Sequence, residues 1–335
     1  MAKKLPRIAI IGGGMAGVTA ALTLHLQADV TLFDKSRGIG GRMATRYADP
    51  WQFDHGAQYF TAHSAGFKKQ CDAWQQQGLI APWHARFVEW QAGTIQRSQQ
   101  WGNETPHYVA NPKMNALLKS LLPDEISVVV NTRITQLVSE NNTWQLLAEN
   151  KVCWEFDWVI LAMPSEQAYA LLQDSQVVTT IPQVDMLPCY TLMLGLNAKA
   201  TLPTWDAALL HDTKLSWMSA NSHKPSRASL PSIVVHTRNA WAQEHLDEDI
   251  TDVQQQLFQH WQTCFPQLAT QVQHKALHRW RYANVGKQDF AQPYFIDAEQ
   301  QLASVGDWFI KGRVESAWMS GYQCATHLKR DLCTD

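Results

Sequence analysis

A short apolar strand, a glycine-rich turn and a helix follow one another directly at the start of this chain. The strand is Ile8–Ile11 and the turn is Gly12–Gly17. In such a turn Gly12 allows the sharp bend, Gly14 lets backbone N–H groups approach a pyrophosphate, and Gly17 allows the helix to pack closely on the strand. The pattern predicts a Rossmann-like domain with a bound dinucleotide.

A carboxylate and a second glycine-rich turn indicate which dinucleotide binds. A strand is expected over 29–33, and it ends at Asp34, where a carboxylate accepts hydrogen bonds from adenosine ribose hydroxyls and repels a 2′-phosphate. FAD and NAD therefore fit better than NADP. The next segment, Arg37–Thr45, contains Gly41 and Arg42, and an arginine fork can bind two phosphate oxygens. NAD-binding domains do not usually need this second turn, so the sequence favours FAD.

Composition limits the remaining classes of function. With 335 residues, of which 45% are hydrophobic, the chain is long enough for about two domains. A net charge of −2 and a pI near 6.7 give no electrostatic footprint for nucleic acid or an anionic membrane. The cysteines form no CxxC pair, and we expect no metal. Apolar stretches are too short to span a membrane, and a cytoplasmic protein is expected.

The expected fold is α/β, with a Rossmann-like FAD-binding domain interleaved with a second domain. The FAD-binding domain, a parallel sheet with helices, is assigned to 1–62, 111–164 and 286–335. The substrate domain, mainly antiparallel α+β, is assigned to 63–110 and 165–285, where runs rich in β-branched and aromatic residues occur.

The sequence also predicts the local structure of three segments. The apolar run Ile126–Val130 is typical of a strand buried on both faces, and Asp249–Phe265 is expected to be a helix with a glutamine-rich exposed face. The Ser-, Lys- and Pro-rich segment Asn221–Ser232 is expected to be a loop, either a mobile loop near an active site or an ordinary surface loop.

Motifs at both ends of the chain together resemble the flavin amine oxidase superfamily. They are the Gly12 turn with Asp34, the Gly40-Gly41-Arg42 turn, the segment Phe53–Thr61, and Gly306-Asp307 with Val314–Ala317. Within that superfamily, Gly41-Arg42-Met43 followed by Gly56-Ala57-Gln58-Tyr59 is most similar to the renalase branch. The middle of the chain carries no motif that matches.

The resemblance implies a set of cofactor-binding residues and a non-covalent FAD. The pyrophosphate would lie on the glycine turn and near Arg42, the ribose at Asp34 and the neighbouring Lys35, the flavin against Gln58 and Tyr59, and the adenine near Arg133 or Ile134. Asp307 would bind ribityl or phosphate oxygens, and Val314 and Glu315 would begin a helix directed at the flavin. The residues implied are Gly12, Gly14, Ala16, Gly17, Asp34, Lys35, Gly41, Arg42, Gln58, Tyr59, Arg133, Ile134, Asp307, Val314 and Glu315.

One departure from the superfamily pattern bears on the substrate. Superfamily enzymes that oxidise amines usually have an aromatic residue just before the apolar-Glu pair of the last helix, and Arg313 stands there in this chain. An arginine would repel a cationic amine. The renalase resemblance implies a different substrate, a dihydronicotinamide isomer (2- or 6-dihydro-NAD(P)), with dioxygen as the electron acceptor.

Hydride loss from a dihydropyridine gives an aromatic pyridinium and needs no general base, so the enzyme has only to orient the donor carbon. No catalytic residue is assigned with certainty, and the pocket candidates are Tyr59, Thr61, Trp280, Arg281, Tyr282 and Arg313. In a strand, Trp280 and Tyr282 share one face and Arg279 and Arg281 the other. Two alternatives stay open: a flavin amine oxidase or desaturase acting on an amine or cyclic substrate, and a non-catalytic FAD-binding interaction protein.

Overall fold

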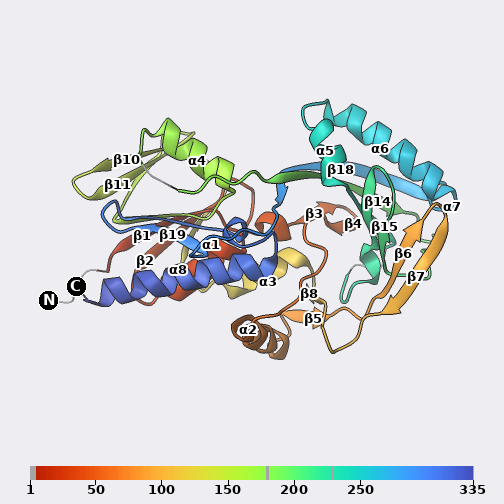
Figure 1. Cartoon of the computed structure of the whole chain (residues 1–335), viewed down its shortest axis with the longest axis horizontal. Helices are drawn as coiled ribbons and strands as arrows, with labels where there is room; N and C mark the ends of the chain where they lie inside the picture. The colour runs from red at the N-terminus through yellow and green to blue at the C-terminus, as the bar shows by residue number, and fades with distance from the viewer. Residues whose placement is uncertain (1–4, 179–180, 228–229, 335) are drawn as a thin grey trace. The chain divides into compact units, whose positions relative to one another are not determined.

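The computed structural model describes residues 5–178, 181–227 and 230–334, and the chain folds into two compact units (Figure 1). Unit 1 comprises Met1–Gly41, Leu118–Met186 and Val285–Asp335, and unit 2 comprises Arg42–Leu117 and Leu187–Asn284. The chain passes between the units at four points: within the 3-10 turn η1 (Gly41–Met43), within helix α3 (Met114–Leu121), and at 186–187 and 284–285.

Unit 1 is built on a six-stranded sheet in the order β19-β20-β13-β1-β2-β9, in which every pair is parallel except β19–β20. The chain moves outward from β1 to β2 and β9 and then crosses to β13 on the other side, as in a doubly wound fold. Its strands are β1 (Arg7–Ile11), β2 (Asp29–Phe33), β9 (Ser127–Val129), β13 (Trp158–Leu161), β19 (Tyr294–Asp297) and β20 (Leu302–Val305). The expected Rossmann-like α/β fold is confirmed.

Different layers cover the two faces of this sheet. An antiparallel sheet of β10 (Ile134–Glu140), β11 (Thr143–Ala148) and β12 (Cys153–Phe156) packs on one face together with α4 (Ser165–Asp174). In Figure 1 this layer lies on the side of the sheet away from α8 (Val314–Thr334), which packs along α1 (Met15–Leu24). The 3-10 turn η3 (Asp307–Phe309) joins β20 to the segment before α8.

The strand expected over 126–130 is more exposed than the sequence predicts. The run 126–130 forms β9, but this strand is at the edge of the sheet, and the side chain of Val128 is 41% exposed. The expectation of a strand buried on both faces was therefore wrong. Apolar composition alone does not distinguish an edge strand from a central one.

Unit 2 contains a seven-stranded sheet in the order β18-β14-β17-β16-β15-β6-β7, antiparallel except for the β15–β6 pair. The mainly antiparallel sheet expected from sequence is thus present. Its strands are β6 (Arg86–Gln91), β7 (Thr94–Gln100), β14 (Leu187–Leu196), β15 (Ala207–Leu210), β16 (Leu215–Ala220), β17 (Ser232–Thr237) and β18 (Val272–Asn284). The other elements are β3 (Thr45–Ala48), β4 (Trp51–Asp54), α2 (Ala65–Gln76), β5 (Ile80–Pro82), β8 (Tyr108–Ala110), η2 (Asn221–His223), α5 (Asn239–Glu244), α6 (Ile250–Cys264) and α7 (Pro266–Ala269).

Helix α6 covers one face of the seven-stranded sheet, above β14 and β18 in Figure 1. Asp249 caps its N-terminus by accepting a hydrogen bond from the N–H of Thr251, and Val253, Leu257 and Trp261 are buried against the sheet. The expected helix and its apolar stripe are confirmed.

The β3–β4 hairpin packs on the sheet of unit 2. Phe53 is fully buried with Met193 and Val234, and a Cβ atom on Gly195 would lie 2.5 Å from the ring of Trp51. Residues 42–62, which the sequence interpretation placed with the FAD-binding domain, therefore pack with unit 2. Residues 165–186 pack with unit 1, since α4 contributes to its core.

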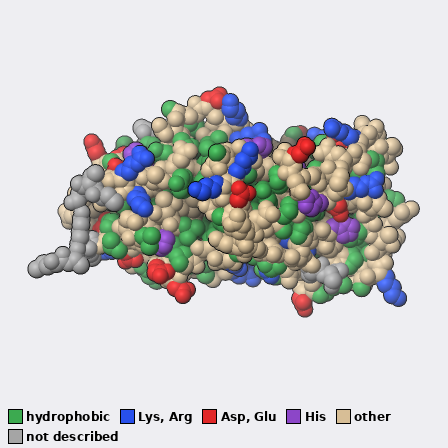
Figure 2. Space-filling view, turned by 90° about the horizontal axis from the view of Figure 1, so that it is seen from below, with side chains coloured by type: hydrophobic (Ala, Val, Ile, Leu, Met, Phe, Trp, Pro, Cys, Tyr) green, Lys and Arg blue, Asp and Glu red, His purple; other side chains and the backbone are tan. Residues whose placement is uncertain are grey.

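Within the part of the chain that the structure describes, every helix is too short or too polar to cross a membrane. Figure 2 shows Lys and Arg side chains mixed with Asp and Glu side chains over the face that it presents. This mixture agrees with the nearly neutral net charge of −2.

Candidate functional site

The glycine turn of unit 1 brings the first strand and helix into very close contact. Gly12 has a φ of +124°, and a Cβ atom on it would lie 2.4 Å from the carbonyl oxygen of Ala162. A Cβ atom on Gly17 would lie 2.0 Å from the carbonyl oxygen of Gly12. Both glycines are therefore required by the packing of the protein itself.

Gly14 has a different environment. It is the N-cap of α1, with φ −85° and ψ −175°, and no side chain caps this helix end. A Cβ atom on Gly14 would have its nearest contact at 4.0 Å, at the Cα atom of Gly41. Protein packing does not require glycine here, whereas a phosphate seated on the N–H groups of the helix end would occupy that space. The turn therefore fits a dinucleotide pyrophosphate.

Asp34 is held in a fixed orientation at the end of β2. One carboxylate oxygen accepts a hydrogen bond from the N–H of Gly13 (3.0 Å) and the other from the N–H of Ser36 (2.7 Å). Desolvation and the nearby guanidinium of Arg133 lower the pKa of Lys35, while Asp34 opposes this shift. Lys35 and Arg133 are thus close enough to interact electrostatically beside the carboxylate, at the end of the cradle expected to hold adenosine.

The C-terminal motif folds in the same unit. Asp307 is 4% exposed directly after β20, and the N–H of Gly306 donates to the hydroxyl of Ser320 on α8 (2.9 Å). Gly321 allows α8 to approach α1, because a Cβ atom there would lie 2.2 Å from the carbonyl oxygen of Ala16. Unit 1 contains these predicted cofactor residues: Gly12, Gly14, Ala16, Gly17, Asp34, Lys35, Gly41, Arg133, Ile134, Asp307, Val314 and Glu315.

The other predicted cofactor residues, Arg42, Gln58 and Tyr59, belong to unit 2. There the turn Gly56–Tyr59 packs on the backbone of Arg42. The N–H of Ala57 donates to the carbonyl oxygen of Arg42 (2.8 Å), and a Cβ atom on Gly56 would lie 2.0 Å from the same oxygen. The turn and the arginine are therefore coupled through the carbonyl oxygen of Arg42.

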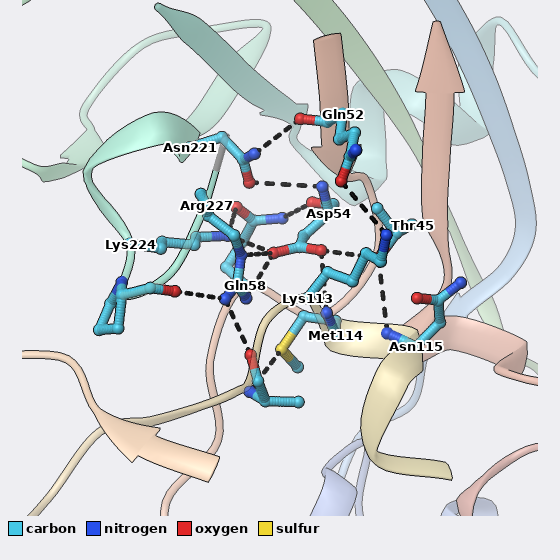
Figure 3. A network of polar contacts seen from close by, with 12 residues as sticks. Thr45, Gln52, Asp54, Gln58, Lys113, Met114, Asn115, Asn221, Lys224 and Arg227 are labelled. Atoms are coloured by element: carbon cyan, nitrogen blue, oxygen red, sulfur yellow. Dashed lines mark hydrogen bonds and ion pairs between the residues drawn. The ribbon is translucent and has the colours of Figure 1, made fainter. Parts of the chain in front are cut away.

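A buried polar network surrounds Asp54, the last residue of β4 (Figure 3). Its carboxylate accepts hydrogen bonds from the Thr45 hydroxyl (2.8 Å) and the Met114 N–H (3.1 Å), and it pairs with Arg227 at 2.7 Å. The Lys224 ammonium lies 3.7 Å from the same carboxylate. Asp54, Lys224 and Arg227 side chains are 1%, 0% and 4% exposed, so two cations share one carboxylate away from water.

The network extends to Gln58. Its amide nitrogen donates to the carbonyl oxygens of Asp54 (2.6 Å) and Gly56 (3.0 Å). Its amide oxygen accepts hydrogen bonds from the hydroxyl of Ser219 (2.8 Å) and the ammonium of Lys224 (3.0 Å). The Gln58 side chain is thus engaged inside unit 2, and a contact between Gln58 and the flavin, which stays a prediction, would be made by its backbone.

Sequence reasoning missed Asp54, Lys224 and Arg227. The segment 221–232 was considered as a loop that is mobile or lies on the surface, but its described residues Asn221, Lys224 and Arg227 are buried. The side chain of Asn221 also binds the backbone of Gln52 and Asp54. Residues 228–229 of this expected loop lie outside the described residues. An Asp and a Lys-x-x-Arg pair about 170 positions apart carry no local signal of contact.

Burial sets the charge states in this part of unit 2. Burial opposes ionisation of Asp54, but the charges of Lys224 and Arg227 and two hydrogen bonds hold its pKa below the usual value. Burial lowers the pKa of Lys224 to about 7, and the charge of Arg227 contributes while Asp54 opposes the shift. Burial and then the Lys224 charge lower the pKa of His236 to about 4.

Two further histidines lie beside Trp280, whose indole N–H donates to the carbonyl oxygen of His55 (3.0 Å). Burial, followed by the charges of His278 and Arg46, lowers the pKa of His55 to about 3. Burial and the Arg46 charge lower that of His278 to about 4. These imidazoles are therefore neutral at pH 7.

The pocket candidates are dispersed. Trp280 faces the 55–56 backbone, whereas Arg281 forms an ion pair with Asp247 at 2.8 Å, on the opposite face of β18 by strand alternation. Thr61 is bonded to His63 (3.0 Å), and Arg313 is exposed directly before α8. Tyr282 is half-buried, two residues beyond Trp280.

Tyr59 belongs to a group of closely packed aromatic rings and is tilted against its neighbours. Its centroid lies 4.9 Å from those of Trp101 and His107, which stack on each other at 3.8 Å, and 5.7 Å from that of Trp217. Phe87 stacks on Trp101 at 5.4 Å. Half-buried Tyr59, Phe87, His107 and Trp217 give unit 2 an aromatic surface next to the turn.

One group among the described residues has donor atoms spaced for a metal: Asp212, His260 and Cys264. The ring nitrogen of His260 already bonds both carboxylate oxygens of Asp212, at 2.8 and 3.0 Å. This ion pair accounts for the arrangement without a metal, and the absence of a metal remains a prediction.

Comparison with known proteins gives two family matches. Residues 10–71 match a NAD(P)-binding Rossmann-like domain, and residues 91–329 match the family described as flavin containing amine oxidoreductase. The second match extends over more than half of the chain.

The chain belongs to the flavin-containing amine oxidoreductase family.

Similar proteins extend the likeness to the full chain. Renalase from Mus musculus is 24% identical over 352 residues, covering 97% of this chain and 99% of the mouse protein. The crystal structure of a protein assigned as a protoporphyrinogen oxidase from Exiguobacterium sp. 255-15 superposes with a TM-score of 0.76 at 11% identity, covering 99% and 100% of the two chains. At that identity the second likeness shows the fold alone.

These findings confirm three expectations from the sequence. The chain is a renalase-like member of the flavin amine oxidase superfamily, it is an FAD-dependent oxidoreductase, and its fold is the expected one. When bound, FAD supplies the redox chemistry. The open Gly14 helix end and the fixed Asp34 carboxylate fit this cofactor.

Proposed function

We propose that this protein is an FAD-dependent oxidase that removes hydride from 2- or 6-dihydro isomers of NAD(P)H. The products are NAD(P)⁺ and hydrogen peroxide: the substrate gives up a hydride, and this hydride and one proton reduce dioxygen. We place the reaction in the cytoplasm, with the dihydronicotinamide dinucleotide and dioxygen as the binding partners and no role for nucleic acid or a membrane.

The excess of positive charge around the Gly56–Tyr59 turn carries this proposal. Arg42 and Arg46, Lys224 and Arg227 lie in or near the turn, with Asp54 as the carboxylate paired into this group. An anionic dinucleotide is attracted to the net positive charge of this group, in which Lys224 and Arg227 are buried, whereas a protonated amine is repelled. Within unit 1, Arg313 is exposed directly before α8, and it too would repel a protonated amine.

The protonation states also fit hydride removal. His55, His236 and His278 have pKa values of about 3 to 4, and the Asp54 carboxylate is occupied by Arg227. Weakly basic imidazoles and a paired carboxylate are poor general bases at pH 7. A dihydropyridine needs none, because its ring nitrogen lone pair drives hydride loss. In this proposal the protein orients the ring, and the aromatic surface around Tyr59 supplies planar contacts for it.

A steady-state measurement tests the proposal. The FAD-loaded enzyme is incubated in air with purified 2-dihydro-NAD or 6-dihydro-NAD, and oxygen consumption, hydrogen peroxide and NAD⁺ are measured together. We expect equal amounts of NAD⁺ and peroxide, with ordinary NADH and simple amines turned over at least 100-fold more slowly. Turnover of an amine with indifference to the isomers would favour the alternative of a flavin amine oxidase or desaturase. A flavin that no donor reduces would favour the interaction protein.

A further inference from the structure

The turn Gly56–Tyr59 is held from two sides. On one side the backbone of Arg42 accepts a hydrogen bond from Ala57. On the other side the Gln58 amide closes the turn onto Asp54 and Gly56 and reaches Lys224. The contacts that fix this turn therefore connect a predicted phosphate-binding arginine to a lysine that is distant in sequence.

Lys224 is the cation that the ion pair does not require. Arg227 donates a hydrogen bond from Nε to the Asp54 carboxylate at 2.8 Å, and its Nη2 lies 2.7 Å from the same oxygen, whereas Lys224 lies farther away at 3.7 Å. A fully buried second cation is costly unless it is hydrogen-bonded. The Lys224 ammonium instead donates a hydrogen bond to the Gln58 amide oxygen, at 3.0 Å.

We propose that Lys224 is a positioning residue that holds the turn Gly56–Tyr59 in place through the Gln58 side chain. This inference rests on the proposed function only in placing Gln58 and Tyr59 against the flavin. Lys224 itself touches neither substrate nor cofactor in this account. Its ammonium can only donate and the Asp54 and Gly56 carbonyls can only accept, so together they fix the Gln58 amide with the oxygen toward Lys224 and the nitrogen toward the turn. Ser219 cannot do this alone, because a hydroxyl can donate or accept.

Charged, polar and aromatic groups from several elements surround the Lys224 ammonium. It faces Asp54 from β4, Gln58 from the turn, Ser219 from β16, His236 from β17, and Arg227 from its own loop, and it lies 5.5 Å from the Trp83 ring before β6.

Between pH 6 and 8 the charge of Lys224 changes, since the pKa of Lys224 is about 7. Asp54 stays ionised with its lowered pKa, and His236, with a pKa of about 4, stays neutral. Hydride removal from a dihydropyridine consumes no protein base. The NAD isomers also carry no titrating 2′-phosphate, so an ionisation near pH 7 in flavin reduction would come from the protein.

The experiment compares Lys224→Met with wild type and with Lys199→Met, a control at an exposed lysine of unit 2. Anaerobic flavin reduction by a dihydro-NAD isomer is followed from pH 6 to 8. We expect the wild-type and Lys199→Met rate constants to fall as the pH rises through about 7. Lys224→Met should be roughly ten-fold slower at pH 6, with little change in substrate affinity and no ionisation near pH 7.

A second variant and a second readout make the test specific. Gln58→Met should lose the same ionisation, and the Lys224→Met/Gln58→Met double variant should be no slower than either single variant, since the two residues act as one unit. Amide hydrogen exchange of the FAD-bound protein should show faster exchange at 55–59 in Lys224→Met and not in Lys199→Met. Gln58→Met provides the same comparison if Lys224→Met does not fold.

The outcomes separate this inference from the proposed function. If the isomers fail to reduce the wild-type flavin while exchange at 55–59 still rises in Lys224→Met, the positioning role stands and the proposed substrate is wrong. If the isomers reduce the flavin but Lys224→Met keeps the ionisation and the exchange pattern of wild type, the positioning role is overturned. Additive losses in the double variant would also contradict it.

Discussion

At the scale of single residues, Asp54 is the central residue of unit 2. Its carboxylate receives a hydroxyl, a backbone N–H and two cations, and its backbone binds Asn221 and Gln58. These contacts join β4, the start of α3, the turn and the 221–227 segment. The sequence placed Asp54 within a recognisable motif but gave no indication of its partners, because they are distant along the chain.

We expect Asp54→Asn to destabilise the protein by about 3–5 kcal/mol, because it leaves two buried cations without a counter-ion. Urea unfolding of the purified protein measures this loss. Asp247→Asn is the matched control: its carboxylate also pairs with an arginine, Arg281, but is 84% exposed. That variant should lie within about 1 kcal/mol of wild type. Equal effects of the two substitutions would contradict the importance assigned to the buried carboxylate.

The buried ammonium of Lys224 predicts a pH dependence of stability. The pKa of Lys224 is about 7 in the folded protein, whereas an unperturbed lysine has a pKa of 10.5. Between these values the unfolded chain binds the proton more tightly, so the free energy of unfolding should rise with pH by up to about 1.4 kcal/mol per pH unit. Below pH 7 both states are protonated and this contribution is constant. Unfolding of wild type and Lys224→Met from pH 6 to 10 measures it, and parallel curves would rule it out.

At the scale of secondary-structure elements, the sequence predicted elements that depend on contiguous residues better than pairings between distant segments. The helix over 249–265 follows from its cap and its apolar stripe, and β1, β2 and the glycine turn follow from contiguous residues. The edge position of β9 and the parallel β15–β6 pair depend on partners far along the chain. The same limit applied to 221–227, whose polar composition predicted a surface or mobile loop, whereas the side chains of Asn221, Lys224 and Arg227 are buried and bind partners inside unit 2.

The glycine turn gives a prediction that separates folding from cofactor binding. In Gly17→Ala the new methyl group meets the Gly12 carbonyl at 2.0 Å, so the apoprotein should lose about 1–3 kcal/mol of stability. In Gly14→Ala the methyl group has no contact below 4.0 Å and the backbone angles suit alanine, so stability should change by less than about 1 kcal/mol.

FAD affinity should nevertheless fall at least ten-fold in Gly14→Ala, because the methyl group takes the space of a phosphate. Flavin fluorescence titration of the apoprotein gives the dissociation constant, and urea unfolding of the same samples gives the stability. Unchanged FAD affinity in Gly14→Ala would show that the pyrophosphate lies elsewhere.

At the scale of the whole molecule, the chain combines a Rossmann-like unit with a unit built on a mainly antiparallel sheet. The cofactor motifs could be predicted from the sequence because each is a short contiguous segment with its own geometry. Three separate parts of the chain that carry such motifs fold together in unit 1. The aromatic and cationic groups of unit 2 were harder to predict from the sequence. Arg42 and Tyr59 lie in recognisable motifs, but the rings of Trp101, His107 and Trp217 and the cations Lys224 and Arg227 come from distant segments that no motif marks.

We propose that hydride passes from a misreduced nicotinamide to the flavin of this enzyme. Anaerobic stopped-flow mixing of the FAD-bound protein with 2- and 6-dihydro-NAD isomers, monitored at the flavin absorbance near 450 nm, tests it most directly. We predict rapid bleaching by at least one isomer in a single phase, and much slower bleaching by ordinary NADH and by amines. A flavin that stays oxidised with both isomers while an amine or a cyclic donor bleaches it would contradict the claim.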